Sequence, residues 1–159
     1  MGSDIDKTSF TPQDYVSFKA ALEENLSSLG QLLSDPAFGV GPGSIGSELE
    51  MYIVDERGYA LSANQEILTA ADDPQLTLEL NRYNLEYNLS PYKLTDAPFA
   101  STEAEILRKL ENLRGVAASF GARIVPIGIL PTLRQSDFGS HCITDRKRFH
   151  ALVSQLIRR

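Results

Sequence analysis

The alternation of apolar and polar residues across positions 76–89 constrains the fold of this chain more than any other feature. Apolar residues fall first on even-numbered positions and then on odd-numbered positions. Alternation with a period of two is typical of a strand with one buried face, and a slip of one residue predicts a bulge or a change of element near Arg82. Because of this slip, Glu79 and Glu86 can share a polar face although they are seven residues apart.

A second strand with an acidic face is expected over residues 45–54. Glu48 and Glu50 are two positions apart in this run, so both side chains point to the same side of the strand. Glutamate is a poor strand former, so these acids lower the strand propensity of the segment. The sequence leaves open the simpler interpretation that they form the polar face of a solvent-exposed strand.

If the glutamates of these two strands converge, they form a metal site. Each like-charged pair at about 5 Å would repel by roughly 3 kcal/mol at an effective dielectric of about 20. Arg82 is the only basic residue close to these acids in the sequence, so the cluster would need cations. Ligands that are all oxygen favour Mg²⁺ or Mn²⁺, and Mg²⁺ bound by carboxylates usually completes its shell with water and substrate phosphates. The pattern therefore predicts the handling of a nucleoside triphosphate.

The rest of the chain predicts long helices around the sheet and hence an α+β fold. Thr11 followed by Pro12 is typical of a helix start, and Thr102 and Glu105 match a capping box. Gly121 would end the helix that the capping box opens. The sequence predicts three helices, over residues 11–34, 102–121 and from about 145 onward, and further strands over residues 59–61 and 123–130.

Length, charge and cysteine content exclude several classes of protein. A chain of 159 residues is expected to form one domain, here residues 11–159, preceded by a flexible segment over residues 1–10. The net charge of −6 has the wrong sign for binding nucleic acid or an anionic membrane. A single cysteine, Cys142, excludes an intrachain disulfide. No secretory leader and no apolar run of about 18 residues is found, so we expect a soluble cytoplasmic protein.

Three motifs then occur in a familiar order, at residues 45–55, 79–91 and 128–132. The first contains the Glu48 and Glu50 pair, the second contains Asn84 to Leu89, and the third is Gly-Ile-Leu-Pro-Thr. Together with the segment 144–149, they resemble the N-terminal part of the glutamate-cysteine ligase type 2 family of carboxylate-amine ligases. The resemblance covers residues 40–159.

This resemblance implies a fold similar to that of glutamine synthetase, in which a curved antiparallel sheet forms a funnel packed with long helices. It implies metal-ligand roles for Glu48, Glu50, Glu79 and Glu86, with Glu50 and Glu86 as the catalytic positions. Asn88 and Arg134 are the substrate-binding candidates that it suggests. The implied cofactor is Mg²⁺ or Mn²⁺, and ATP is the implied co-substrate.

The implied activity is the ATP-dependent joining of glutamate to an amine, such as cysteine, through an acyl phosphate. Family enzymes continue well beyond the motifs present here, so we expect residues 11–159 to be the N-terminal portion of a longer catalytic domain. One alternative is a truncated or non-catalytic metal- or nucleotide-binding module that assembles with a partner chain. Another is a structural role in which an open sheet edge pairs with another chain and the glutamates are solvated surface.

Overall fold

The computed structural model describes residues 4–157, in which the chain forms two compact units. One unit comprises residues 43–145, and the other comprises residues up to Pro42 together with residues from Arg146 onward. Residues 1–3 of the expected flexible segment and residues 158–159 of the expected domain lie outside the described residues. The expectation of a single domain over residues 11–159 stays a prediction.

The unit formed by residues 43–145 is built on a four-stranded antiparallel sheet with the strand order β3-β4-β2-β6. Its strands are β2 (Glu48–Val54), β3 (Leu76–Leu78), β4 (Asn84–Asn88) and β6 (Arg123–Val125). The short strands β1 (Ser44–Ile45) and β5 (Tyr92–Lys93) pair with each other as a separate two-stranded sheet. The fold is therefore α+β, as the sequence predicts.

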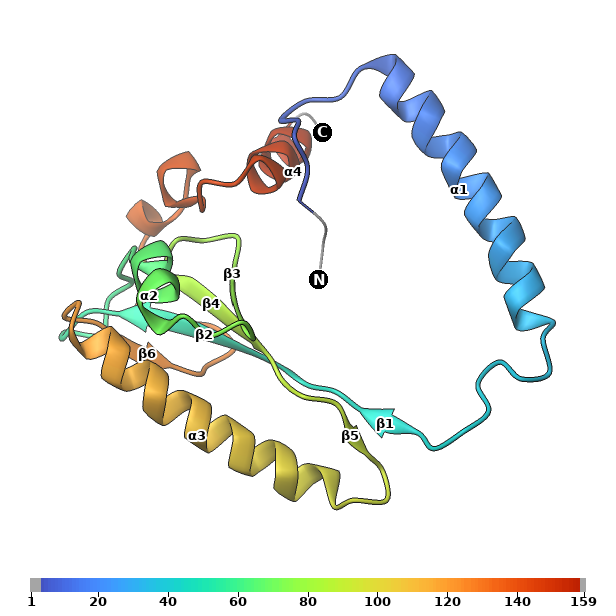
Figure 1. Cartoon of the computed structure of the whole chain (residues 1–159). Helices are drawn as coiled ribbons and strands as arrows, with labels where there is room; N and C mark the ends of the chain where they lie inside the picture. The colour runs from blue at the N-terminus through green and yellow to red at the C-terminus, as the bar shows by residue number, and fades with distance from the viewer. Residues whose placement is uncertain (1–3, 158–159) are drawn as a thin grey trace. The chain divides into compact units, whose positions relative to one another are not determined.

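One face of the four-stranded sheet is apolar, and helices cover it (Figure 1). Helix α3 (Pro98–Ala118) contacts β6 and β5, and helix α2 (Asn64–Ala71) contacts α3 and β3. Burying this face removes apolar surface from water and so stabilises the unit. The fully buried side chains of this core include Met51, Ile53, Ile67, Leu85, Tyr87 and Leu113.

The slip in alternation coincides with a break between two strands. Strand β3 ends at Leu78, β4 begins at Asn84, and residues 79–83 join them. The prediction of a change of element near Arg82 is thus confirmed. The predicted strand at residues 59–61 reduces to a single bridge between Val54 and Ala60.

The predicted start of the second long helix is wrong. Helix α3 begins four residues earlier, because Pro98 occupies its first position and proline fixes φ at a helical value. Thr102 lies inside the helix, and the Glu105 side chain points into the core instead of capping. Helix α2 has no counterpart among the expected elements, and β6 ends at Val125, well before the predicted end at residue 130.

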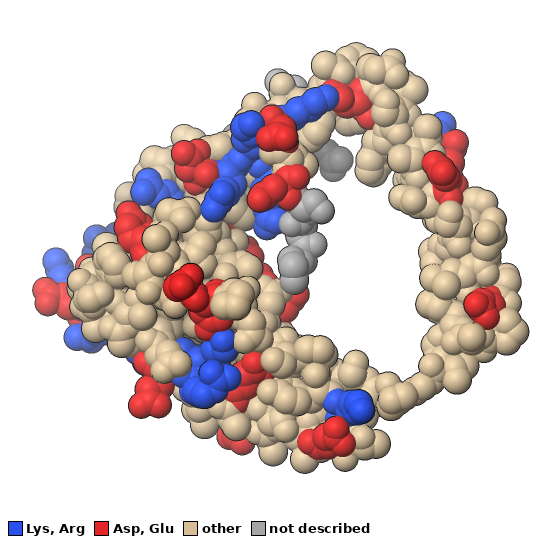
Figure 2. Space-filling view, in the orientation of Figure 1, with Lys and Arg blue, Asp and Glu red and all other residues tan. Residues whose placement is uncertain are grey.

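The second unit contains helix α1 (Pro12–Leu33) and helix α4 (Lys147–Ile157). The predicted cap of α1 is confirmed, since the Thr11 side chain accepts a hydrogen bond from the Asp14 amide. Helix α1 buries none of its residues, and the side of α1 that Figure 2 shows is mostly uncharged. Among the described residues, no helix is both long enough and apolar enough to cross a membrane.

Candidate functional site

The acidic face of the sheet carries the predicted glutamates and lies opposite the buried core. Along β2, Glu48 and Glu50 are exposed, whereas Met51 and Ile53 are fully buried. This is the alternation expected for a strand with one face toward water. The prediction that Glu48 and Glu50 point to the same side is confirmed.

The register between β2 and β4 places acidic and amide side chains directly opposite one another. Glu50 pairs with Glu86, and Glu48 pairs with Asn88. Opposed residues in an antiparallel pair have Cβ atoms about 5 Å apart, so these side chains are direct neighbours on one face. Like charges opposed in this way destabilise a sheet, and the Glu50–Glu86 pair is therefore an unfavourable feature of the isolated fold.

Glu79 joins this face from the segment between β3 and β4. Burial and a hydrogen bond from Glu79 raise the pKa of Glu86 above its usual value, and the negative charge of Glu79 adds to the effect. A hydrogen bond from the Asn88 side chain acts in the opposite direction. The sequence-based expectation that Glu79 and Glu86 share a face is thus confirmed. Because the two carboxyl groups lie close together, the ionised form of one disfavours the ionised form of the other.

The acids of this face lack a cationic partner within their own unit. Within residues 43–145, the described salt bridge joins Lys109 to Asp73, and none of the described salt bridges involves the four glutamates. Within residues 4–157, no three His, Cys, Asp or Glu side chains come together as a group that could hold a metal ion. Among the described residues, the face therefore offers opposed carboxylates and not a complete cage of ligands.

None of the described contacts of Arg134 reaches the acidic face. Its guanidinium carbon lies 3.5 Å from the centre of the Tyr59 ring, and its backbone amide donates to Asp137 at 2.7 Å. Arg57 contacts the same ring from 5.3 Å. None of the described hydrogen bonds or salt bridges joins Arg134 to Glu48, Glu50, Glu79 or Glu86.

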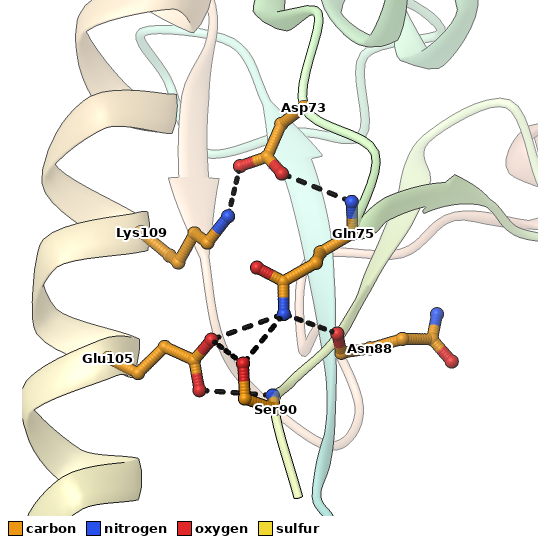
Figure 3. A network of polar contacts seen from close by, with 6 residues as sticks. All are labelled: Asp73, Gln75, Asn88, Ser90, Glu105 and Lys109. Carbon is orange, nitrogen blue, oxygen red and sulfur yellow. Dashed lines mark hydrogen bonds and ion pairs between the residues drawn. The ribbon is translucent and has the colours of Figure 1, made fainter.

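A buried polar network holds the end of β4 from the other side of the sheet (Figure 3). The Gln75 amide nitrogen donates to the backbone oxygen of Asn88 and to the Glu105 carboxylate, both at 3.1 Å. Glu105, which is 5 % exposed, also accepts from the backbone and hydroxyl of Ser90 at 3.1 and 2.9 Å. Figure 3 shows the Asn88 side chain pointing away from this network.

Sequence reasoning missed the residues that support the acidic face from within the fold. Gln75 and Glu105 belong to this group, as do two buried polar residues, Asn64 and Thr144, each 2 % exposed. Their partners lie 13 to 80 residues away along the chain, so no local pattern marks them. A usable signal is the polar side chain within an otherwise apolar helical stripe, as Glu105 is in α3.

The chain was compared with protein families, with curated proteins and with solved structures. The model of glutamate-cysteine ligase family 2 matches residues 44–158, which is more than half of the chain. No curated protein and no solved structure matches this chain. The matched region contains the whole of the acidic face, from Glu48 to Asn88. The chain belongs to glutamate-cysteine ligase family 2.

Proposed function

We propose that this chain is the N-terminal portion of an ATP-dependent carboxylate-amine ligase of the glutamate-cysteine ligase kind. The reaction would transfer the terminal phosphoryl group of ATP to the side-chain carboxylate of glutamate and release ADP. The amine would then attack the acyl phosphate, so that an amide bond forms and phosphate leaves. Cysteine is the amine suggested by the family.

One observation carries this proposal, namely the placing of Glu50 directly opposite Glu86, with Glu79 against Glu86, in a chain of this family. Opposed carboxylates without a cation are unfavourable, and a divalent ion between them removes the repulsion. Mg²⁺ is commonly held by one or two carboxylates, with water and substrate phosphates as its other ligands. The paired acids of this face fit that mode, although they form no cage of three.

Glu48, Glu50, Glu79 and Glu86 would hold Mg²⁺ or Mn²⁺ in this proposal. A bound divalent ion neutralises the charge that develops on the phosphoryl oxygens during transfer. The task of the chain's own residues is to orient the reactants and to keep the carboxylates ionised. A cation beside Glu86 would lower the pKa of its carboxyl group, because a neighbouring positive charge favours the ionised form.

The two substrate-side candidates have different support. Asn88 lies opposite Glu48 in the sheet and contacts Glu86, so its side-chain amide can hydrogen-bond a substrate held over the acidic face. Arg134 is stacked on Tyr59 and would need to change its contacts to reach a substrate at that face. We propose a substrate role for both residues and expect the larger effect at Asn88.

The wider family expectations complete the proposal. The four-stranded sheet would be part of a glutamine synthetase-like funnel, whose remaining strands come from further chain or from another subunit. Strands β3 and β6 are the outer strands of the sheet and could pair with a second copy. An acidic chain with Cys142 as its single cysteine is compatible with the reducing cytoplasm.

One observation favours a second candidate function. Among the described residues, the acidic face offers pairs of carboxylates instead of a three-ligand group. In this alternative the chain binds a metal ion or a nucleotide without catalysing ligation, and it assembles with a partner chain. Both functions require a metal-dependent nucleotide site on the acidic face. They differ in whether the purified chain releases ADP when glutamate and an amine are supplied.

The decisive experiment is thermal unfolding with ATP and Mg²⁺ together, with each alone and with neither. A ligand at about 100 times its dissociation constant adds roughly 2.7 kcal/mol of stability, so we expect Tm to rise only when both are present. Glu50→Gln should abolish that rise. Glu66→Gln, on the exposed surface of α2, is the matched control and should retain it. A rise that survives Glu50→Gln would contradict the placing of the site.

A further inference from the structure

The segment between β3 and β4 carries Glu79, and it has little regular structure of its own. Residues 79–83 lie outside both strands, apart from one bridge between Asn81 and Ile143. A loop of this kind needs support if it is to hold a carboxylate against Glu86. Its backbone groups must also find hydrogen-bond partners where they are buried.

Thr144 provides part of this support from a distant point in the sequence. Its hydroxyl donates to the backbone oxygen of Glu79 at 2.6 Å, and its backbone amide donates to the backbone oxygen of Leu80 at 2.8 Å. Thr144 is 2 % exposed, so water does not compete for these contacts. Two successive carbonyl groups of the loop are thus held by one residue.

Asn64 completes the support from the first turn of α2. Its side-chain nitrogen donates to the Thr144 hydroxyl at 2.8 Å and lies 3.2 Å from the backbone oxygen of Asn81. Its backbone amide donates to the backbone oxygen of Arg82 at 3.1 Å. Asn64 therefore bonds both to the loop and to the residue that holds the beginning of the loop.

These contacts form a closed arrangement in which each buried polar group has a partner. Among the described residues, no buried side-chain nitrogen or oxygen atom lacks a hydrogen bond. An apolar pair of similar shape could fill the same space at little cost in stability, because the net contribution of an intramolecular hydrogen bond is only about 1 kcal/mol. Directed hydrogen bonds give what apolar packing does not, which is a defined position for the loop backbone.

We infer that Asn64 and Thr144 are positioning residues that set Glu79 against Glu86 and thereby tune metal binding on the acidic face. This inference rests on the proposed function, since it assigns these residues a role at the same metal site. Neither residue would touch the metal. Both would act through the backbone of residues 79–82, as outer-shell partners of metal ligands commonly do.

The test uses the full chain and Mn²⁺ alone as the probe, with free Mn²⁺ measured by electron paramagnetic resonance. Thr144→Val keeps the side-chain shape but removes the hydroxyl that links Asn64 to Glu79. We expect its dissociation constant for Mn²⁺ to rise about tenfold, the lower end of the effect of outer-shell substitutions. Thr144→Ser restores the hydroxyl and should bind within about twofold of the unsubstituted chain.

A matched control separates positioning from a general loss of stability. Ile67→Val is the control, because Ile67 lies on the same helix as Asn64, is fully buried and belongs to the apolar core. It should lower the unfolding free energy by about 1 kcal/mol and leave Mn²⁺ affinity unchanged. All affinities are measured at a temperature where circular dichroism shows each variant folded.

The possible results are distinguishable. Equal Mn²⁺ affinity in Thr144→Val and in the unsubstituted chain overturns the inference and leaves the proposed metal site intact. Equal weakening by Ile67→Val and Thr144→Val overturns it as well, because stability alone would then explain the loss. If the unsubstituted chain binds no Mn²⁺, the proposed metal site fails and the inference fails with it. Should Thr144→Val not fold, Asn64→Ala provides the same comparison.

Discussion

Two groups of carboxylates lie on opposite sides of the same sheet. The pKa values of Asp73 and Glu105 are lowered on one side, and the pKa of Glu86 is raised on the other. Behind the sheet, burial alone would raise the pKa of Asp73 and of Glu105. Hydrogen bonds from Lys109 and Gln75 to Asp73, and from Ser90 and Gln75 to Glu105, outweigh burial and lower both values. On the acidic face, burial and Glu79 together raise the pKa of Glu86.

The difference shows which form of each carboxyl group the fold stabilises. Asp73 and Glu105 have donors for their oxygen atoms, and their charged forms are stabilised within the fold. Burial and the neighbouring Glu79 disfavour the charged form of Glu86. The group around Glu105 is therefore structural, and the group around Glu86 is the one to which the proposed function assigns cation binding.

The largest expected effect is the loss of Glu105, which would break the satisfied group. Glu105→Ala removes a buried acceptor from the Ser90 amide, the Ser90 hydroxyl and the Gln75 side-chain amide. Hydrogen bonds to a charged acceptor contribute about 1.5–3 kcal/mol each, so the unfolding free energy should fall by about 3 kcal/mol in urea titrations. Glu103→Ala, at an exposed position of the same helix, should change it by less than about 0.5 kcal/mol. Equal effects of Glu105→Ala and Glu103→Ala would mean that the hydrogen-bond network does not contribute to the unfolding free energy.

A smaller effect with a pH signature is expected at Lys109. Its ammonium group lies 2.5 Å from Asp73, and it also lies 5.4 Å from the centre of the Tyr87 ring. Lys109→Met should lower the unfolding free energy by about 2 kcal/mol at pH 7, because a buried carboxylate loses its partner. Lys93→Met, at an exposed position, is the control and should be neutral.

The pH dependence of that difference follows from the lowered pKa of Asp73. In the unsubstituted chain, its ionised form stabilises the fold above the unfolded pKa of 3.8, and this stabilisation is lost as pH falls below that value. Lys109→Met removes the part of this stabilisation that comes from the Lys109 ammonium group. The difference in unfolding free energy between the unsubstituted chain and Lys109→Met should therefore be largest near pH 7. It should become smaller as pH falls from about 5 to about 3. A gap that stays constant would show that the charge of Asp73 is irrelevant.

The smallest expected effect has the opposite sign and lies on the acidic face. Glu86→Gln removes a carboxyl group whose pKa is raised in the folded state. The unfolding free energy of the metal-free protein should therefore rise by roughly 0.5 kcal/mol at pH 7. Below about pH 4, Glu86 is protonated in both the folded and the unfolded protein, so its raised pKa no longer lowers the unfolding free energy. The gain from Glu86→Gln should therefore vanish there. Thermal unfolding of metal-free protein at pH 7 and pH 4 measures both points. Destabilisation by Glu86→Gln at pH 7 would make Glu86 a structural residue and dissolve the contrast between the two groups.

Much of the acidic face could be predicted from the sequence, because it depends on alternation along single strands. Glu48 and Glu50 are two residues apart, and the slip near Arg82 brings Glu79 and Glu86 to one face. The capping box at Thr102 misled the prediction of α3, since Pro98 starts that helix earlier and Glu105 is used in the core. The amphipathic pattern of α1 predicts the helix correctly but does not show that the helix buries nothing.

The sequence by itself determined the polar and apolar faces of the strands, the cap of α1 and the family motifs. All three are set by neighbours within a few residues, where backbone geometry decides which side chains share a face. Only the tertiary structure decided that Glu50 faces Glu86, that Glu105 is a buried acceptor and that Asn64 and Thr144 meet beneath Glu79. These contacts join residues up to 80 positions apart, and they exist only once packing of the core has brought distant segments together.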